Sequence, residues 1–394
     1  MSQLKTNAIR HTTATSDAIT LASDGTATAK ITNNLSNRNI IINGAMNVAQ
    51  RGTSSTSSDF GLDRWKVQWS GQDEALTHAQ HALTSSDTGP WAKGFRNSLH
   101  VTNGNQTSGA GAADYANIRY VPEAQDLACS GWDSTSSSSK LTLSFWIRCN
   151  VANNVGIYSR LDDSSGDKNF TSETGNLTAD TWTYVTKVIP GASHLTINHD
   201  NGIGWLMQFI PFYGTDYSDG SAVLDTWKSA GTIKPTTDNW ITSNNAYMDI
   251  TGVQLEVADA ATDFEHRTYD QELSACQRYF QVYHDKVGVI LRVHSSTQAL
   301  THIPLHKQMR DVPTYAIAPS NANFDVLDNG GVLANQGHAW WTWSAGGARQ
   351  AGWELMGTRS AGTWSDLNTV IHANFQYEYG PSDGHYFATA NSEL

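Results

Sequence analysis

Residues 141–150 alternate between apolar and polar side chains with a period of two. One side of the segment has Leu141, Leu143, Phe145 and Ile147. The other side has Thr142, Ser144, Trp146 and Arg148. Such alternation, with aromatic and branched residues, predicts a half-buried β-strand. Residues 181–189 and 204–210 have the same character, and prolines follow them closely. The pattern predicts a β-sandwich in the middle of the chain.

Residues 286–394 contain further runs of this kind and predict another β-domain. The expected strands are 287–293, 299–305, 314–318, 340–343, 351–356 and 371–379, with a final pairing strand from residue 386. Helix is sparse. The best helix candidate is 272–283, where Leu273, Cys276, Tyr279 and Phe280 have helical spacing.

Residues 1–38 are polar, with isolated apolar side chains at Leu4, Ile9, Ile19, Leu21 and Ile31. Residues 18–29 predict two short strands around a turn at Asp24–Gly25. The segment has too little apolar surface to build a core alone, so it is either disordered or folds against neighbouring chains. Its strand-like pattern favours the second alternative.

Composition narrows the class of protein. The chain has 394 residues, which suggests two or three domains, and its 16% of charged residues beside 14 Trp and 14 Tyr favour strands over helices. A net charge of −12 argues against a nucleic-acid partner. Three widely spaced cysteines form neither a disulfide framework nor a zinc pattern, which suggests a reducing compartment. With no signal peptide and no long apolar run, we expect a soluble protein that does not insert into membranes.

A set of segments, in a particular order and spacing, carries a family resemblance. The segments are 39–52 (NIIINGAMNVAQRG), Asp63–Trp65, 98–102, 116–121, 141–150, Trp182, Pro190–Gly191, 251–257, 263–269 and 272–280. Together they resemble the carbohydrate-binding-module-like jelly roll of tailed-phage fibre and tail proteins, in particular those of marine phages and cyanophages. Residues 4–12 and 19–25 resemble fibre leader segments, and Met309–Pro313 resembles a turn in the same proteins. The resemblance spans roughly residues 1–285.

The predicted fold class is therefore mainly β, with three parts. These are an N-terminal attachment and oligomerisation segment (1–38), a jelly-roll β-sandwich (39–268) and a distal C-terminal β-sandwich (269–394). The resemblance implies a virion structural protein, a tail or head fibre that contacts a host-surface glycan or receptor. It further implies a homotrimer, made in the host cytoplasm, that joins other virion proteins through its N-terminal segment. Two alternatives stay open: a connector or capsid decoration protein that binds no glycan, and a polysaccharide depolymerase.

Candidate chemistry is limited. The chain has no nucleophile elbow, phosphate-binding loop or marked carboxylate pair, so no catalytic residue and no enzymatic activity is predicted. Asp162, Asp163 and Asp167 could supply oxygen ligands to a cation, although a solvated turn is favoured. Jelly rolls of this type often hold a structural calcium; no other cofactor is expected.

Aromatic side chains are the best candidates for glycan stacking. Trp341 and Trp343 fall on one face of an expected strand, and Trp353 follows nearby. The competing interpretation is that these rings fill a core. Trp146 has two alternatives, because it either packs against the second sheet or lines an open face.

Overall fold

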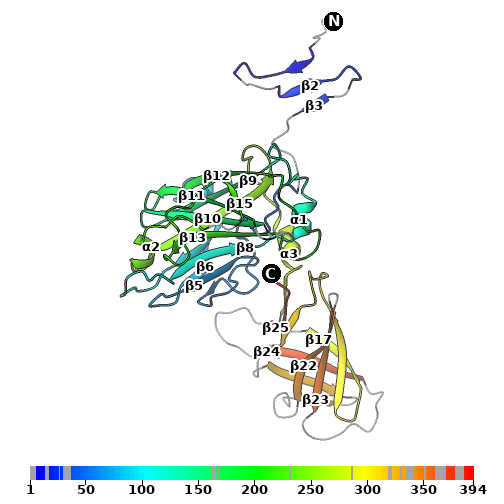
Figure 1. The fold of residues 1–394 in the computed structure, drawn as a ribbon. Coiled ribbons are helices and arrows are strands. Elements are labelled where there is room, and N and C mark those ends of the chain that lie inside the picture. Colours follow the sequence, from blue (N-terminus) through cyan, green and yellow to red (C-terminus); the bar gives the residue numbers. More distant parts are fainter. Residues whose placement is uncertain are drawn as a thin grey trace.

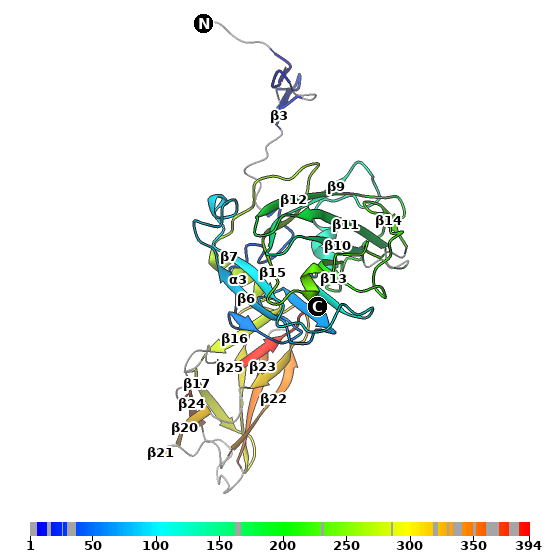
Figure 2. The same ribbon diagram turned by 90° about the vertical axis from the view of Figure 1, so that its left-hand side faces the viewer.

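The computed structural model describes most of the chain. The described residues are 6–13, 17–25, 27–29, 37–161, 166, 168–229, 232–284, 287–317, 322–328, 331–333, 341–349, 352–359, 370–377 and 386–394. Figures 1 and 2 show three parts in a row: a small N-terminal sheet, a central β-sandwich and a group of C-terminal strands. None of the helices in the described ranges is long and apolar enough to span a membrane.

The N-terminal part is a three-stranded antiparallel sheet. Its strands are β1 (Ala8–Ile9), β2 (Ile19–Leu21) and β3 (Ala27–Ala29). The two strands predicted around Asp24–Gly25 are β2 and β3. Gly25 has a φ of 87°, a value that glycine adopts without strain.

The central part is a sandwich of two antiparallel six-stranded sheets. Sheet I has the order β14-β11-β10-β13-β8-β5 and sheet II the order β12-β9-β15-β7-β6-β4. Sheet I consists of β5 (Lys66–Ser70), β8 (Tyr115–Tyr120), β10 (Asn153–Leu161), β11 (Lys168–Leu177), β13 (Trp205–Tyr213) and β14 (Trp227–Lys228). Sheet II consists of β4 (Ser54–Ser55), β6 (Thr77–Ala82), β7 (Asn97–Thr102), β9 (Lys140–Cys149), β12 (Thr183–Pro190) and β15 (Tyr247–Val257). The helices are η1 (Trp91–Lys93), α1 (Ala124–Ala128), α2 (Asn239–Thr242) and α3 (Tyr269–Cys276).

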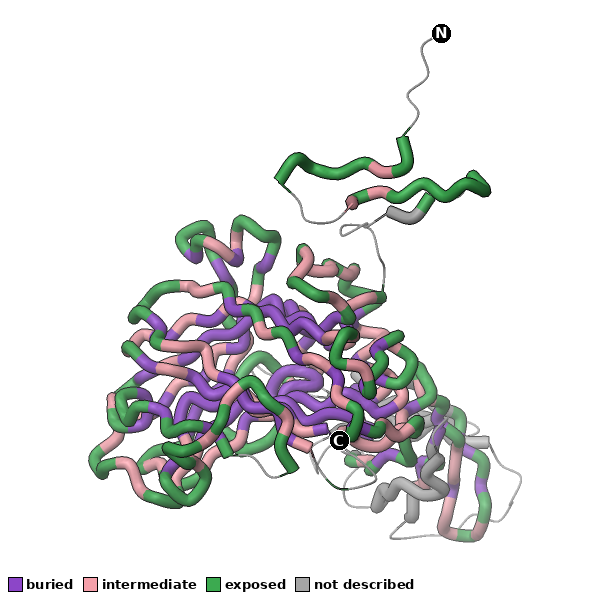
Figure 3. The backbone as a smooth tube through the Cα atoms, turned by 45° about the horizontal axis from the view of Figure 1, so that its top comes forward, coloured by how far each residue is buried: buried purple, intermediate pink, exposed green. Residues whose placement is uncertain are grey.

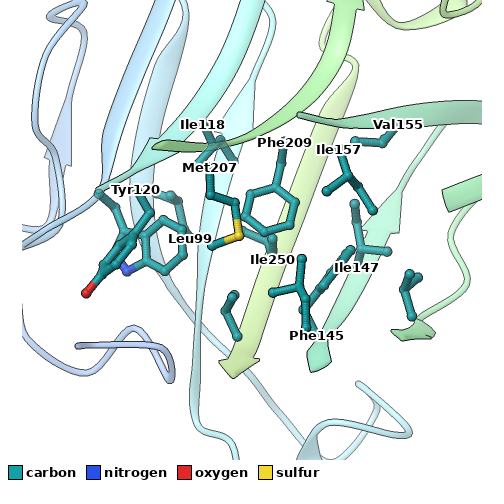
Figure 4. Close-up of a cluster of buried hydrophobic side chains, with 14 of the residues drawn as sticks. Leu99, Ile118, Tyr120, Phe145, Ile147, Val155, Ile157, Met207, Phe209 and Ile250 are labelled. Atoms are coloured by element: carbon teal, nitrogen blue, oxygen red, sulfur yellow. The ribbon is translucent and has the colours of Figure 1, made fainter. Parts of the chain in front are cut away.

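The alternation along β9 explains how the sandwich closes. Leu143, Phe145 and Ile147 are fully buried and face sheet I. The ring of Phe145 meets that of Phe209 from β13 edge-on, with centroids 4.8 Å apart (Figure 4). Figure 3 shows the buried residues concentrated in the middle of the central part. The core therefore forms where the sequence pattern predicts a sandwich.

The C-terminal part contains two sheets. The seven-stranded sheet has the order β21-β20-β24-β17-β18-β23-β22, and the three-stranded sheet the order β16-β25-β19. The strands are β16 (Phe280–His284), β17 (Val287–Val293), β18 (Gln298–Pro304), β19 (Thr314–Ile317), β20 (Ala322–Asp328), β21 (Gly331–Leu333), β22 (Trp341–Arg349), β23 (Gly352–Arg359), β24 (Val370–Tyr377) and β25 (Tyr386–Asn391). The predicted mainly-β fold class is confirmed.

The predicted helix over 272–283 is only partly correct. Helix α3 begins at Tyr269, where Thr268 and Gln271 form a capping box, and it ends at Cys276. Residues 280–284 instead form β16, which pairs with β25. A strand more than 100 residues away thus decides the conformation of the second half of this segment.

The chain returns to the sandwich after β25. The Glu393 carboxylate is almost fully buried and forms ion pairs with Arg64 and, at 3.3 Å, with Arg51. The guanidinium of Arg64 lies 3.5 Å from the centre of the Tyr279 ring. Burial alone would lower the pKa of Arg64, but the Glu393 carboxylate and the nearby tyrosines raise it above its ordinary value. This contact joins the end of the chain to the core of the sandwich.

Candidate functional site

Trp146 lies on the outer face of sheet II. Its neighbours Phe145 and Ile147 point into the core, so Trp146, one position out of phase, faces away from sheet I. The structure therefore resolves the two alternatives for this residue in favour of the open face.

Tyr184 lies directly opposite Trp146 on the edge strand β12. The two ring centroids are 5.1 Å apart and the planes are inclined by 43°. Trp146 is half-buried, whereas Tyr184 is 44% exposed. Two adjacent strands thus present a pair of accessible aromatic rings on the outer face of sheet II.

A cleft of about 590 Å³ opens beside these rings, and we call it the aromatic cleft. It is lined by Ala92, Lys93, Phe95, Ser144, Trp146, Tyr184, Gly252, Ala261, Thr262, Asp263, Phe264 and His266. Its volume lies within the range of small-ligand sites, which combine aromatic walls with a few polar groups. Phe264 packs edge-on against Phe95, with centroids 4.8 Å apart, and both rings line the cleft.

Two glycines allow the backbone to approach the aromatic rings of the cleft. A Cβ on Gly89 would lie 2.7 Å from the Trp146 ring, and one on Gly252 would lie 2.6 Å from the Phe95 ring. Both residues have positive φ, 100° at Gly89 and 62° at Gly252. Any side chain at these positions would have to displace a ring.

A buried carboxylate holds the wall formed by residues 261–266. Glu256 is 1% exposed and accepts hydrogen bonds from the backbone N–H and the hydroxyl of Thr262, at 2.9 and 2.7 Å. The side-chain oxygen of Gln254 accepts a further bond from the backbone of Glu265, at 2.8 Å. These bonds fix Thr262 and Phe264 relative to sheet II before any ligand arrives.

A network of charges continues along the same face from the cleft. Arg148 forms ion pairs with Asp249 at 2.7 Å and with Asp87 at 2.9 Å, and its guanidinium lies 4.8 Å from the centre of the Trp182 ring. His100 lies 2.8 Å from the other oxygen of Asp249. Burial disfavours the charged form of Asp249, but His100 and Arg148 hold its pKa below the ordinary value. Through Asp87, the network ties the loop that carries Gly89 to sheet II.

The chemistry available in the aromatic cleft favours binding. Aromatic faces can stack on the apolar C–H faces of a sugar ring, while Ser144, Thr262 and Asp263 can bond to its hydroxyl groups. Among the described lining residues, Asp263 is the one carboxylate. Hydrolysis by paired carboxylates requires a second such group about 5–9 Å away.

A larger hollow of about 1180 Å³ lies where residues 37–42 enter the sandwich. Two of its charged groups, Glu265 and Arg267, are already engaged with the protein. Glu265 accepts a hydrogen bond from the backbone of Asn39 at 2.8 Å and pairs with Arg267 at 3.4 Å. We therefore regard the aromatic cleft as the better candidate.

The predicted stacking residues lie in the C-terminal part. The structure describes the strands that carry Trp341, Trp343 and Trp353, but these three side chains lie outside the described set. The pairing places Trp353 opposite Ile303, and Trp343 opposite Gly357, two positions from Leu355. These pairings place the backbone and not the side chains, so stacking of Trp341, Trp343 and Trp353 on a glycan stays a prediction.

The other predicted site residues divide between described and undescribed positions. In the N-terminal sheet, Ile9 is 50% and Leu21 39% exposed, and Ile19 is half-buried. Leu4, Ile31, Asp162, Asp163 and Asp167 lie outside the described residues. Among the described residues, no group of three or more His, Cys, Asp or Glu side chains is arranged to hold a metal ion.

Sequence reasoning missed Tyr184 and the wall around Phe264 as parts of a site. The sequence marked Trp146 as an aromatic residue on the polar side of an alternating strand, but residues 181–189 show no such regular alternation around Tyr184. Phe264 belongs to a loop, and no local pattern predicts that it reaches the outer face of sheet II.

Comparisons with known proteins give a likeness at low similarity. No family model and no curated protein matches the chain. Among solved structures, the enzymatically active domain of tailspike protein 4 from bacteriophage CBA120 is 12% identical with a TM-score of 0.30, and the match covers 56% of this chain and 21% of that one. A candidate sugar-binding protein from Bacteroides thetaiotaomicron is 11% identical with a TM-score of 0.30, over 56% and 100% of the two chains.

A third similar structure is that of the CBM22-1 and GH10 modules of Clostridium thermocellum xylanase 10B with xylohexaose. It is 10% identical with a TM-score of 0.27, over 59% of this chain and 32% of that one. The chain thus spans about a fifth of the tailspike structure and a third of the xylanase structure. At these TM-scores the likeness adds nothing to the geometry of the aromatic cleft.

Proposed function

We propose that this protein is a virion fibre protein of a tailed bacteriophage that binds host-surface glycans, and that the aromatic cleft is a sugar-binding site. The observation that carries the glycan-binding proposal is the accessible pair Trp146 and Tyr184 beside a cleft of about 590 Å³. Exposed aromatic rings next to a hollow with few polar groups are typical of ligand sites.

The physical basis for sugar binding is stacking combined with hydrogen bonding. A sugar ring that lies on Trp146 and Tyr184 buries apolar surface on both partners, and the groups that line the cleft satisfy its hydroxyls. The cleft walls are held by Glu256 and by glycine-dependent contacts, so little ordering is needed on binding.

The virion role rests on the sequence resemblance of residues 1–285 and on the N-terminal sheet. That sheet has three short strands with Ile9 and Leu21 exposed, and a sheet of this size is marginally stable alone. Neighbouring copies of the chain, as a homotrimer, would cover these side chains and join the fibre to other virion proteins. Several linked copies would also raise avidity about 10²–10⁴-fold.

The test is binding of the purified full chain to an array of surface glycans, followed by titration of the best oligosaccharide. We expect Trp146→Ala and Tyr184→Ala each to weaken the affinity about 10-fold or more, which corresponds to about 1.4 kcal/mol. Tyr269→Ala is the matched control, because Tyr269 is 59% exposed and lies outside the aromatic cleft. Circular dichroism verifies folding, and light scattering reports the oligomer.

Each alternative function has its own outcome in this test. A folded oligomer that binds no glycan would support a connector or decoration protein. Shortening of a bound polysaccharide would support a depolymerase. Binding that survives both cleft variants would place the sugar elsewhere.

A further inference from the structure

The outer face of sheet I, on the opposite side of the sandwich from the aromatic cleft, carries a row of polar residues. Lys66, Arg119, Gln208 and Tyr158 lie directly opposite one another across β5, β8, β13 and β10. Their neighbours Val67, Ile118, Phe209 and Ile157 are buried in the core, so the row faces outward. Arg160 lies two positions beyond Tyr158 on the same face. We call these five residues the cationic patch.

Arg119 has no protein partner for its charge. Its Nε is buried without a hydrogen-bond partner, and no carboxylate in the described part of the chain forms an ion pair with it. Burial and then the positive charge of Arg160 lower the pKa of Arg119 from its ordinary value. Because an arginine stays charged in a protein, the partial burial of this guanidinium without a partner costs free energy.

The neighbouring polar groups are satisfied. Gln208 donates to Asn117 at 3.3 Å, Asn117 donates to the Tyr213 hydroxyl at 3.2 Å, and Tyr213 donates back to Gln208 at 3.4 Å. Lys66 pairs with Asp59 at 3.1 Å. Gln208 and Lys66 thus have partners within the protein, whereas Arg119 has none among the described residues.

Three tyrosines adjoin the patch. Tyr115 lies on the same face of β8 as Arg119, and its ring packs edge-on against Tyr213 and Tyr217, with centroids 6.2 and 5.5 Å away. Tyr217 is 41% exposed. Aromatic rings beside a planar guanidinium suit a ligand that carries both a ring and an anionic group.

We propose that the cationic patch binds an anionic group of a polysaccharide, a carboxylate or a sulfate. Arg119 makes the principal contact, because its fork of N–H donors matches two oxygens of such a group. Arg160 adds positive charge, and the tyrosines contact the sugar ring. The patch is a second site, separate from the aromatic cleft, in a chain whose net charge is −12.

The test titrates the full chain with polygalacturonate and dextran sulfate, with neutral dextran as the control polymer. We expect both charged polymers to bind, with affinity that falls as salt rises. Arg119→Gln should weaken binding at least 10-fold. Lys228→Gln, which removes one exposed charge from β14 of the same sheet, should change it less than twofold. Trp146→Ala should bind both polymers as the wild type does.

Thermal unfolding provides a readout that does not depend on affinity. Without ligand, Arg119→Gln should have a higher Tm than the wild type, because the substitution removes an unpaired, partly buried charge. Polygalacturonate should raise the Tm of the wild type but not that of Arg119→Gln. Equal affinity of Arg119→Gln and the wild type would overturn the proposal, as would a lower Tm for that variant. Binding of inorganic phosphate or sulfate with no binding of either polymer would also overturn it, because the patch would then hold free ions.

Discussion

Asp249 is the charged residue most completely enclosed on the outer face of sheet II. Its side chain is fully buried and accepts hydrogen bonds from Ser98 and Arg148, with His100 at 2.8 Å. Asp249→Asn would leave the positive charge of Arg148 without its closest partner. We expect a loss of about 3–5 kcal/mol in the free energy of unfolding, measured in urea. Asp59→Asn, which breaks an exposed pair with Lys66, should cost at most about 1 kcal/mol.

The same network predicts a pH dependence of stability. Burial raises the pKa values of Asp249 and Asp87, yet both lie below 3.8 in the folded protein. His100 and Arg148 lower that of Asp249, and hydrogen bonds from the Thr84 backbone and the Trp182 indole, together with Arg148, lower that of Asp87. Their contribution is therefore fully present above the unfolded value of 3.8 and is lost as the pH falls through the folded values. Urea unfolding between pH 6 and pH 2.5 should show a steeper decline below pH 4 for the wild type than for Asp249→Asn. Equal slopes would contradict this account.

Residue-level prediction from the sequence succeeded where the alternation was regular. The side of the strand on which Trp146 lies follows from Phe145 and Ile147, but whether that side is open depends on which loops cover it. Nor could Arg119 be recognised, since the absence of a partner is a property of the folded surface.

At the scale of elements, the loop that carries Gly89 is packed against Trp146 on β9. In Gly89→Ala the new Cβ would push the ring from its place, and the positive φ would add about 1–3 kcal/mol of strain. We expect glycan affinity to fall about 10-fold. Gly131→Ala is the matched control, because Gly131 also has a positive φ, of 86°, but has open space around its Cβ position. A similar loss of affinity in both variants would show that strain alone is responsible.

Helix α3 shows why element boundaries were harder to predict than strands in the sandwich. Leu273, Cys276, Tyr279 and Phe280 do have helical spacing, yet the helix ends at Cys276. Phe280 belongs to β16, which pairs with Asn391 of β25. A local pattern contains no information about a partner strand so far along the chain.

At the scale of the whole molecule, Glu393 connects the last strand to the sandwich. Glu393→Gln keeps the shape of the side chain but leaves the buried guanidinium of Arg64 without its carboxylate. We expect a loss of about 3–5 kcal/mol in stability. Glu354→Gln, at an exposed position on β23, should have little effect. An unchanged unfolding midpoint for Glu393→Gln would mean that the contact does not stabilise the fold.

The three-part organisation followed from changes in pattern along the chain, whereas the contacts between parts did not. Arg64 and Glu393 are 329 residues apart, and neither stands in a motif that marks it for pairing. The aromatic cleft is similarly assembled from β9, β12, the loop after η1 and the segment after β15. Sequence reasoning therefore predicted the sandwich, whereas the stacking role that it gave to Trp341, Trp343 and Trp353 stays a prediction.

The most direct test of the central claim is a crystal structure of the protein with the oligosaccharide that binds it most tightly on the glycan array. The account predicts a sugar ring in van der Waals contact with Trp146 and Tyr184, with a hydroxyl bonded to Thr262 or Asp263. A sugar bound around Trp341 and Trp343 in the C-terminal sheet, with the aromatic cleft empty, would contradict it.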